Sequence, residues 1–411
     1  MTTNTPPRLS RCRCQRSLGS RTRNNVCYGG GGSVSLNSSS FLFQYHGSHH
    51  RQGTSVPCAA AAAASSPSHS HSHSQTLCAS SLLCGVGDGS DADADDSADI
   101  AKLIITLADA CKAIGNAIET APLMNIEGYT NQTNASGDSQ KKLDVVANEI
   151  LTRHLRESNL VSYLASEEEE NVQTVTPDAP FVVVFDPLDG SRNVDVSIPV
   201  GTIFGVYRTL PNAAESIDSQ VLRPGRDMLF SGYANYSVQT TFALASPFAN
   251  QVDFYTLDRS TDEFVQTAER VQCPPTGEIY SLNDARYFDW SDNLRRYIDD
   301  MRQGKNESGK SFSSRYVCSL VSDFHRTLLQ GGWCGNPRSH LRVVYECAPL
   351  ALIAERAGGA ASDGTADGHI LDINPTSLHA RTPLFCGSRA TIDELRTYGD
   401  VRQVSTKTYA Y

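Results

Sequence analysis

The segment that most limits the possible folds is FVVVFDPLDGSRNVD, residues 181–195. Its five apolar residues at 181–185 predict a strand that is buried on both faces. The run leads directly into Asp186 and Asp189, and Pro187 between them excludes a helix interior. Because open α/β sheets bind ligands at the carboxyl ends of their strands, we expect both carboxylates in a ligand site. A turn whose acids accept only local hydrogen bonds is the alternative interpretation.

Patterns typical of helices and strands alternate along the rest of the chain. Apolar residues recur at helical spacing in four segments: 99–119, 141–158, 315–329 and 349–359. Strand patterns occupy three segments: 181–185, 201–207 and 237–245. This interleaving predicts a layered α/β architecture. We expect the first helix to begin with Asp99 near its N-cap.

Charge is distributed unevenly along the 411 residues. Residues 1–90 hold seven arginines, no lysine and one acid, whereas the remainder holds 28 basic and 44 acidic residues, a net charge of −16. Nucleic-acid binding needs a cationic surface, so the acidic remainder disfavours that class of function and is compatible with cation binding. No apolar run approaches the roughly 18 to 20 residues that are needed to cross a bilayer, so we do not expect this chain to be a membrane protein.

The first 90 residues are expected to be an organelle transit peptide followed by a low-complexity linker. They are rich in Ser and Arg and contain no acid before Asp88, which is the composition of such addresses. Residues 91–98 are strongly acidic and are expected to form a second linker. The folded region is therefore expected to begin near Asp99 and to include residues 99–411.

The folded region contains six cysteines, none in a C-x-x-C pair: Cys111, Cys273, Cys318, Cys334, Cys347 and Cys386. Most of them lie in apolar or helical context. We expect buried free thiols in a reducing compartment rather than a disulfide scaffold.

Further acids occur beside apolar runs elsewhere in the chain. Glu167 and Glu168 come directly after VSYLA, and Glu346 interrupts an apolar run just before a helix, where capping is its alternative role. Asp138 lies in a polar loop, and Asp144 lies at the start of the next helix. Carboxylates gathered at several strand ends would repel one another, and hard divalent cations relieve that repulsion.

The expected cation is Mg²⁺, since ions held in this way can clamp a phosphate and activate a water. The DGS triplet at 189–191 offers backbone N–H groups and a hydroxyl, which suit a phosphate oxygen. The residues thus predict a metal-dependent phosphate site.

Five blocks, in matching order and spacing, resemble the fructose-1,6-bisphosphatase family over roughly residues 99–400: DPLDGSRNVD…GTIFGVY, ASEEEE, YSLNDARYFDW, YVCSLVSDFHRTLL and LRVVYECAPLALIAERAGGAASDG. DPLDG alone would indicate only the wider superfamily of Mg²⁺-dependent, lithium-sensitive phosphatases. Segment 208–230 contains no cysteine, which resembles the plastid form that lacks the redox-regulatory loop.

The resemblance implies a layered αβαβα sugar-phosphatase fold, with an N-terminal half at about 99–270 and a C-terminal half at about 271–411. It also implies a homotetramer in the chloroplast stroma. Two or three Mg²⁺ ions per site would be held by Glu167, Asp186, Asp189, Glu346 and the backbone carbonyl of Leu188. Glu168 and Asp144 would orient and deprotonate the attacking water, and Asp138 would lie on a loop that closes over the metals.

For the substrate, the resemblance implies two phosphate subsites. Asp189, Gly190 and Ser191 would hold the 1-phosphate. Asn283, Tyr316 and His340 would hold the 6-phosphate, together with Arg315 from a neighbouring subunit. Among the residues of the substrate site, the chain departs from the family pattern at three positions, with Arg192 in place of a serine, Asn336 in place of a tyrosine and His340 in place of a lysine.

The implied reaction is Mg²⁺-dependent hydrolysis of the C1 phosphate of fructose 1,6-bisphosphate, giving fructose 6-phosphate and phosphate. Sedoheptulose-1,7-bisphosphatase is the nearest alternative. An inositol or nucleotide monophosphatase would share the DPLDG chemistry without a second phosphate subsite. A non-catalytic, metal-binding protein is disfavoured because the set of acids is intact.

Overall fold

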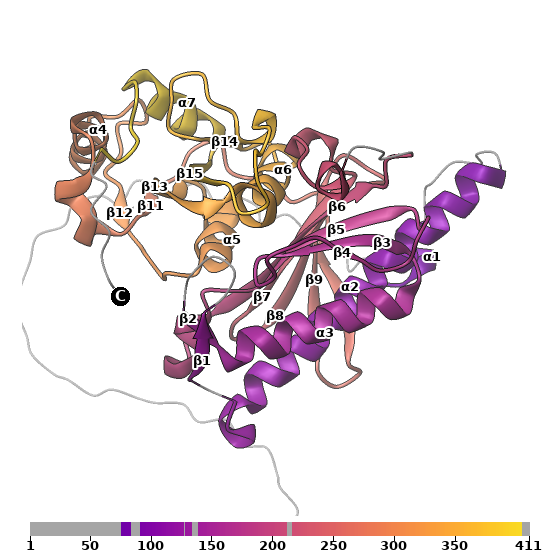
Figure 1. Ribbon diagram of the computed structural model, residues 1–411. Coiled ribbons are helices and arrows are strands. Elements are labelled where there is room, and N and C mark those ends of the chain that lie inside the picture. Colours follow the sequence, from indigo (N-terminus) through magenta and orange to yellow (C-terminus); the bar gives the residue numbers. More distant parts are fainter. Residues whose placement is uncertain (1–74, 84–90, 127, 134–138, 212–215, 405–411) are drawn as a thin grey trace, which may run out of the picture. The chain divides into compact units, whose positions relative to one another are not determined.

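The run predicted at 181–185 forms strand β5 (Phe181–Asp189) of an eight-stranded mixed sheet (Figure 1). The computed structural model describes residues 75–83, 91–126, 128–133, 139–211 and 216–404, all within the unit His69–Tyr411. Every residue of β5 is buried. Val183 packs in one apolar cluster and its neighbours Val182 and Val184 in another, because successive side chains of a strand point to opposite faces.

The eight-stranded sheet has the order β10 (Glu263–Ala268), β9 (Val252–Asp258), β8 (Thr240–Ala245), β7 (Phe230–Tyr236), β6 (Val200–Arg208), β5, β3 (Val161–Ser166) and β4 (Gln173–Thr174). Only β3 and β5 are parallel neighbours within it. A five-stranded sheet has the order β12 (Ser313–Ser314), β11 (Ile279–Ser281), β13 (Trp333–Arg342), β15 (Arg381–Gly387) and β14 (Ala360–Ser362). Strands β1 (Tyr129–Thr133) and β2 (Ser139–Lys141) form a separate pair.

Helices form three layers around the two sheets. Helices α2 (Asp91–Met124) and α3 (Lys142–Ser158) cover one face of the eight-stranded sheet. Helices α5 (Leu320–Gln330) and α6 (Ala348–Arg356) lie between the sheets (Figure 1), and α4 (Asp292–Gln303) and α7 (Arg389–Thr397) cover the outer face of the five-stranded sheet. The predicted αβαβα order is therefore confirmed. No helix in the described parts of the chain has the length and apolarity needed to cross a membrane.

Helix α2 begins earlier than the sequence predicts. Residues 91–98 belong to α2, so the expectations of a linker there and of an N-cap at Asp99 are wrong. Acids are favourable in the first turns of a helix, where the helix dipole is positive. Asp96 also forms an ion pair with Arg208 at the end of β6.

A short segment within the predicted tail also belongs to the fold. The Leu77 N–H donates to the Phe264 carbonyl at 2.7 Å, and the Gln266 N–H donates to the Gln75 carbonyl at 2.8 Å, both on edge strand β10. Helix α1 (Ala79–Leu82) follows, and Leu77 and Leu82 are buried in the cluster beneath α2. The prediction placed this segment in a linker because its flanks are low in complexity. Residues 1–74 and 84–90 lie outside the described residues.

We expect Leu82→Ala to destabilise the protein by about 2 kcal/mol, because the substitution leaves a cavity in the apolar cluster beneath α2. Urea unfolding should show a lower midpoint with an unchanged slope. The matched control is Leu123→Ala at the end of α2, where the leucine is 84 % exposed and truncation should change the midpoint little. Equal midpoints for the two variants would show that the segment is not part of the folded unit.

Helix α5 begins five residues later than the helical pattern suggests. Ser319 caps it, accepting a hydrogen bond from the Ser322 N–H at 3.3 Å. The Asp323 carboxylate accepts hydrogen bonds from the N–H groups of Val317 and Cys318, which holds the preceding residues outside the helix. Cys318 is consequently exposed, so the expectation of a buried thiol is wrong there, whereas the other five cysteines of the folded region are buried and free.

Candidate active site

A β-bulge places the two aspartates of DPLDG on one side of the sheet. Asp186 pairs with Ile203 and Asp189 with Gly201, so three steps along β5 oppose two along β6. Residues three apart on a regular strand point to opposite faces, and the extra residue restores a common side. Asp186 Oδ1 also accepts the Leu188 N–H at 3.0 Å, so a local turn and a shared site coexist.

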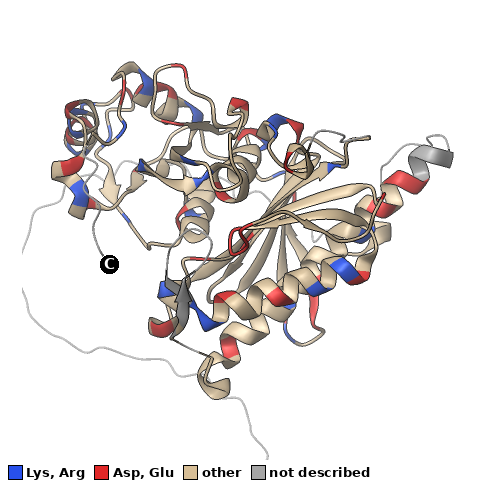
Figure 2. Cartoon of the chain, in the orientation of Figure 1, with Lys and Arg blue, Asp and Glu red and all other residues tan. Residues whose placement is uncertain are grey.

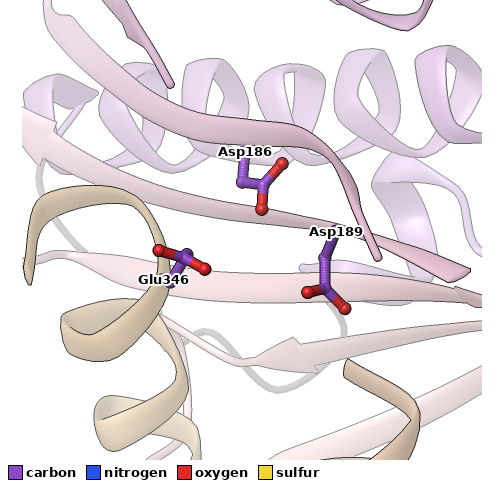
Figure 3. A group of neighbouring side chains, drawn as sticks. All are labelled: Asp186, Asp189 and Glu346. Carbon is purple, nitrogen blue, oxygen red and sulfur yellow. The ribbon is translucent and has the colours of Figure 1, made fainter. Parts of the chain in front are cut away.

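Glu346 completes a group of three acids (Figure 3). It lies in a π-helical turn, η5 (Val343–Cys347), and π-turns often occur at functional sites. One carboxylate oxygen from each of Asp186, Asp189 and Glu346 lies within 4.8 Å of the others, and all three residues are buried. Three hard oxygen donors at this spacing fit a divalent cation such as Mg²⁺.

The electrostatics of the three acids also fit a cation. Burial raises the pKa of Asp186 well above its ordinary value, and the charges of Glu167, Glu346 and Asp189 raise this pKa further. Burial raises the pKa of Glu346 to about 7, although Arg342 opposes that shift through its charge and its N–H. These carboxylates therefore ionise at a cost that a bound cation would remove.

The turn that follows β5 is fixed by a contact with the start of α5. Asp189 Oδ2 accepts hydrogen bonds from the Ser319 hydroxyl at 2.8 Å and from the Val321 N–H at 2.9 Å. Gly190 has a φ of +74°, and a Cβ there would lie 3.0 Å from the Cβ of Ser319. The positive φ and the close approach of Ser319 both favour glycine at this position.

Arg342 is a member of the site that the sequence interpretation missed. The Arg342 guanidinium forms a buried ion pair with Glu167, and the backbone N–H of Arg342 donates to Glu346 Oε2 at 2.5 Å. Glu167 follows directly after β3, and its own N–H donates to the Phe185 carbonyl at 3.0 Å. Arg342 therefore supplies positive charge to a group of acids drawn from three separate segments. The available signal was a basic residue within the apolar run LRVVYE, four residues before Glu346.

Asp144 lies in the first turn of α3 and lines one cavity together with Asp186, Asp189 and Glu346. Its Oδ2 accepts the Lys141 N–H at 2.9 Å and the Ser191 hydroxyl at 3.3 Å. Its Oδ1 is buried and has no hydrogen-bond partner among the described residues. Burial raises the pKa of Asp144 to about 6. A carboxylate oxygen that is buried beside the other acids in this way suits the acceptance of a proton.

These residues line a single cavity of about 310 Å³. The cavity contains nearly all the predicted site residues: Asp144, Glu167, Glu168, Asp186, Leu188, Asp189, Gly190, Ser191, Asn283, Tyr316, His340 and Glu346. Arg315 is exposed and is not among the lining residues, and its guanidinium donates to the Ser314 carbonyl at 2.8 Å. Asp138 lies outside the described residues.

Four arginines share this cavity with the acids: Arg192, Arg286, Arg338 and Arg342. Arg286 belongs to the short helix η4 (Asp284–Asp289), and Arg338 and Arg342 belong to β13. Figure 2 shows charged residues mainly along the helices and at the strand ends, and few along the strands of the eight-stranded sheet. A cavity with grouped carboxylates and several guanidinium groups suits an anionic ligand that is bound together with cations.

Comparison with known proteins agrees with this geometry. The profile described as fructose-1-6-bisphosphatase, N-terminal domain, matches residues 85–269, and that of the C-terminal domain matches residues 273–400. The chain belongs to the fructose-1,6-bisphosphatase family. The predicted resemblance and the α/β phosphatase fold are thereby confirmed.

Named members of the fructose-1,6-bisphosphatase family match most of the chain. The chloroplastic fructose-1,6-bisphosphatase of Pisum sativum is 40% identical over 73% of this chain and 79% of its own length. The chloroplastic fructose-1,6-bisphosphatase 1 of Arabidopsis thaliana is 41% identical over 70% and 73%, respectively. The holo form of Leishmania major fructose-1,6-bisphosphatase superposes with a TM-score of 0.71 at 33% identity, covering 79% of this chain and 98% of that structure.

Proposed function

We propose that this chain hydrolyses the C1 phosphate of fructose 1,6-bisphosphate, giving fructose 6-phosphate and inorganic phosphate. The supporting observation is one cavity that joins three buried carboxylates to the DGS turn and to several arginines, in a chain of the fructose-1,6-bisphosphatase family. The carboxylates fit metal binding, and the turn and the arginines fit a phosphate.

The proposed metal ligands are Asp186, Asp189, Glu346, Glu167 and the carbonyl of Leu188, which would hold two or three Mg²⁺ ions. When bound, Mg²⁺ supplies Lewis-acid stabilisation of phosphoryl charge and a lower pKa for water. Arg342 would neutralise part of the carboxylate charge and orient Glu167 through their ion pair.

The proton of the attacking water is proposed to pass to a carboxylate of this chain. Asp144 is the stronger candidate because its buried Oδ1 has no partner among the described residues while Oδ2 is held by two donors. Glu168 lines the same cavity and would orient the water. Asp138, which lies outside the described residues, is proposed to act beside the metals.

The near phosphate is proposed to bind at Asp189, Gly190 and Ser191, which line the cavity and offer backbone N–H groups and a hydroxyl. The far phosphate would contact Asn283, Tyr316 and His340, which line the same cavity. Arg315 is exposed, which is compatible with a contribution to a neighbouring subunit's site in a homotetramer.

A plastid location is proposed for the protein. Its curated relatives from Pisum sativum and Arabidopsis thaliana are named chloroplastic enzymes. The first 87 residues contain no acid and are rich in Ser and Arg, as in transit peptides.

The test of the function is a phosphate-release assay on the full chain, with fructose 1,6-bisphosphate, sedoheptulose 1,7-bisphosphate and inositol monophosphate as substrates. We expect the highest kcat/KM on fructose 1,6-bisphosphate, no release after chelation, and recovery when Mg²⁺ is added. A higher kcat/KM on sedoheptulose 1,7-bisphosphate would identify that sugar as the preferred substrate in place of fructose 1,6-bisphosphate. Release from none of the three would reject the proposal.

The Mg²⁺ requirement should depend on pH. Glu346 has a pKa of about 7, and a metal must displace its proton before the carboxylate can bind. The Mg²⁺ concentration for half-maximal activity should therefore fall as the pH rises from about 6 to about 8, by up to about tenfold per unit below the pKa. Titrations of activity against Mg²⁺ at several pH values measure this, and a constant half-maximal concentration would contradict it.

A further inference from the structure

A bulge in β13 carries a basic segment into the active-site cavity. Asn336 pairs with Leu384 and Leu341 pairs with Thr382, so five steps along β13 oppose two along β15. The residues between them leave the regular ladder, and such irregularities redirect side chains next to active sites. Arg338 belongs to this segment, is half-buried and lines the cavity.

The guanidinium of Arg338 has no acidic partner in the described structure. The backbone N–H of Arg338 donates a hydrogen bond to Asn336 Oδ1 at 3.1 Å. The side chain of Arg338 forms no ion pair or hydrogen bond with any described residue. By contrast, Arg342 on the same strand is bound to Glu167, and Arg326 beside the cavity is bound to Asp323. Residues 91–411 carry a net charge of −16, so acids are plentiful in this part of the chain. A guanidinium that lines the cavity and pairs with none of the described acids is available to bind an anion from solution.

The position of Arg338 along β13 suits the far end of a substrate. Arg342 forms ion pairs with Glu167 and with Glu346, one of the three grouped acids, and Arg338 precedes Arg342 by four residues. Four residues of strand span at most about 13 Å, and the bulge shortens this distance. A sugar bisphosphate whose near phosphate lies at the carboxylates would place its other phosphate within this range.

We propose that Arg338 binds the substrate phosphate that lies farther from the three grouped acids, and that it sets the preference for sugar bisphosphates over monophosphates. The inference rests on the proposed function and adds a residue to it. A guanidinium can bind a phosphate through two parallel hydrogen bonds, so its loss weakens binding more than its replacement by an ammonium. Because Arg338 belongs to the same chain as the three grouped acids, its contact with the far phosphate does not require a neighbouring subunit.

The test compares Arg338→Ala with the unmodified protein on two substrates, fructose 1,6-bisphosphate and fructose 1-phosphate, which lacks the far phosphate. The ratio of kcat/KM for the bisphosphate to that for the monophosphate should fall about ten- to a hundredfold, the scale of a charge-assisted hydrogen bond. Arg338→Lys should recover part of that ratio. The matched control is Arg153→Ala, which removes an exposed arginine from α3 outside the cavity and should leave the ratio unchanged.

A binding measurement separates this inference from the proposed function. Calorimetric titration with fructose 6-phosphate, which carries only the far phosphate, should show a Kd about tenfold higher or more for Arg338→Ala than for Arg153→Ala. If the unmodified protein releases phosphate from neither substrate, the proposed function fails. If it hydrolyses the bisphosphate and Arg338→Ala, folded by circular dichroism, keeps both the ratio and the Kd, the assignment of Arg338 is overturned.

Discussion

Replacement of Asp186 by asparagine is expected to reduce kcat for phosphate release by about 10³-fold, the scale of a lost electrostatic contact in a transition state. The substitution keeps the size of the side chain and removes one of three buried carboxylates, each of which has one oxygen within 4.8 Å of an oxygen of the other two. A neutral amide is a poorer Mg²⁺ ligand than a carboxylate, so the remaining acids should hold the cation weakly. Steady-state kinetics at saturating substrate and increasing Mg²⁺ measure the loss.

Although Asp186→Asn should lower kcat, it should increase the stability of the metal-free protein. The pKa of Asp186 is raised in the folded state, so its ionisation costs folding free energy at neutral pH. Asp186→Asn should therefore raise Tm in a chelator and reduce the rise in Tm that Mg²⁺ produces. The control is Asp253→Asn, a buried aspartate on β9 bonded to the Arg270 N–H, which should retain Mg²⁺-dependent activity. Normal turnover by Asp186→Asn would show that this carboxylate binds no essential metal.

Asp144→Asn should reduce kcat by about 10²- to 10³-fold, the range typical of a lost general base. Asp144 presents a buried Oδ1 without a described partner beside the metal-binding acids, and its pKa of about 6 leaves it ionised at neutral pH. An amide in its place accepts no proton. Unlike Asp186→Asn, this variant should keep the Mg²⁺-induced rise in Tm, because Asp144 is outside the group of three carboxylates.

The comparison of these two variants tests the division of roles. At Mg²⁺ concentrations that saturate the site at every pH, so that protonation of Glu346 does not limit activity, the acidic limb of the pH–rate profile near pH 6 should also disappear in Asp144→Asn, since the titrating group is absent. A variant that retains this limb and most of its kcat would show that another carboxylate accepts the proton. Glu168→Gln would then be the next substitution, as Glu168 lines the same cavity.

The parts of the site that the sequence predicted well depend on local patterns. A continuous apolar run ending in DPLDG locates β5 and its acids without knowledge of the neighbouring strands. Acids placed next to other apolar runs, such as Glu167 and Glu346, are recognisable for the same reason. All four acids named in this way line the observed cavity.

The parts that the sequence did not predict depend on distant partners. The bulge at Asp186 is defined by its register against β6, and no residue of DPLDG specifies that register alone. Arg342 was not predicted as a site residue because its partner Glu167 lies far away in the sequence. The late start of α5 likewise follows from Asp189 and Asp323, whose hydrogen bonds hold the residues around Ser319.

The pairing of residues 75–77 with β10 sets a limit on how much of the chain could be removed together with the proposed transit peptide. β10 is the last strand of its sheet, and edge strands with open N–H and C=O groups are prone to pair with other chains. Cleavage after Leu83 would expose that edge and the apolar surface that Leu77 and Leu82 cover. Removal of the proposed transit peptide should therefore end before Gln75, and a chain trimmed further should aggregate or be degraded.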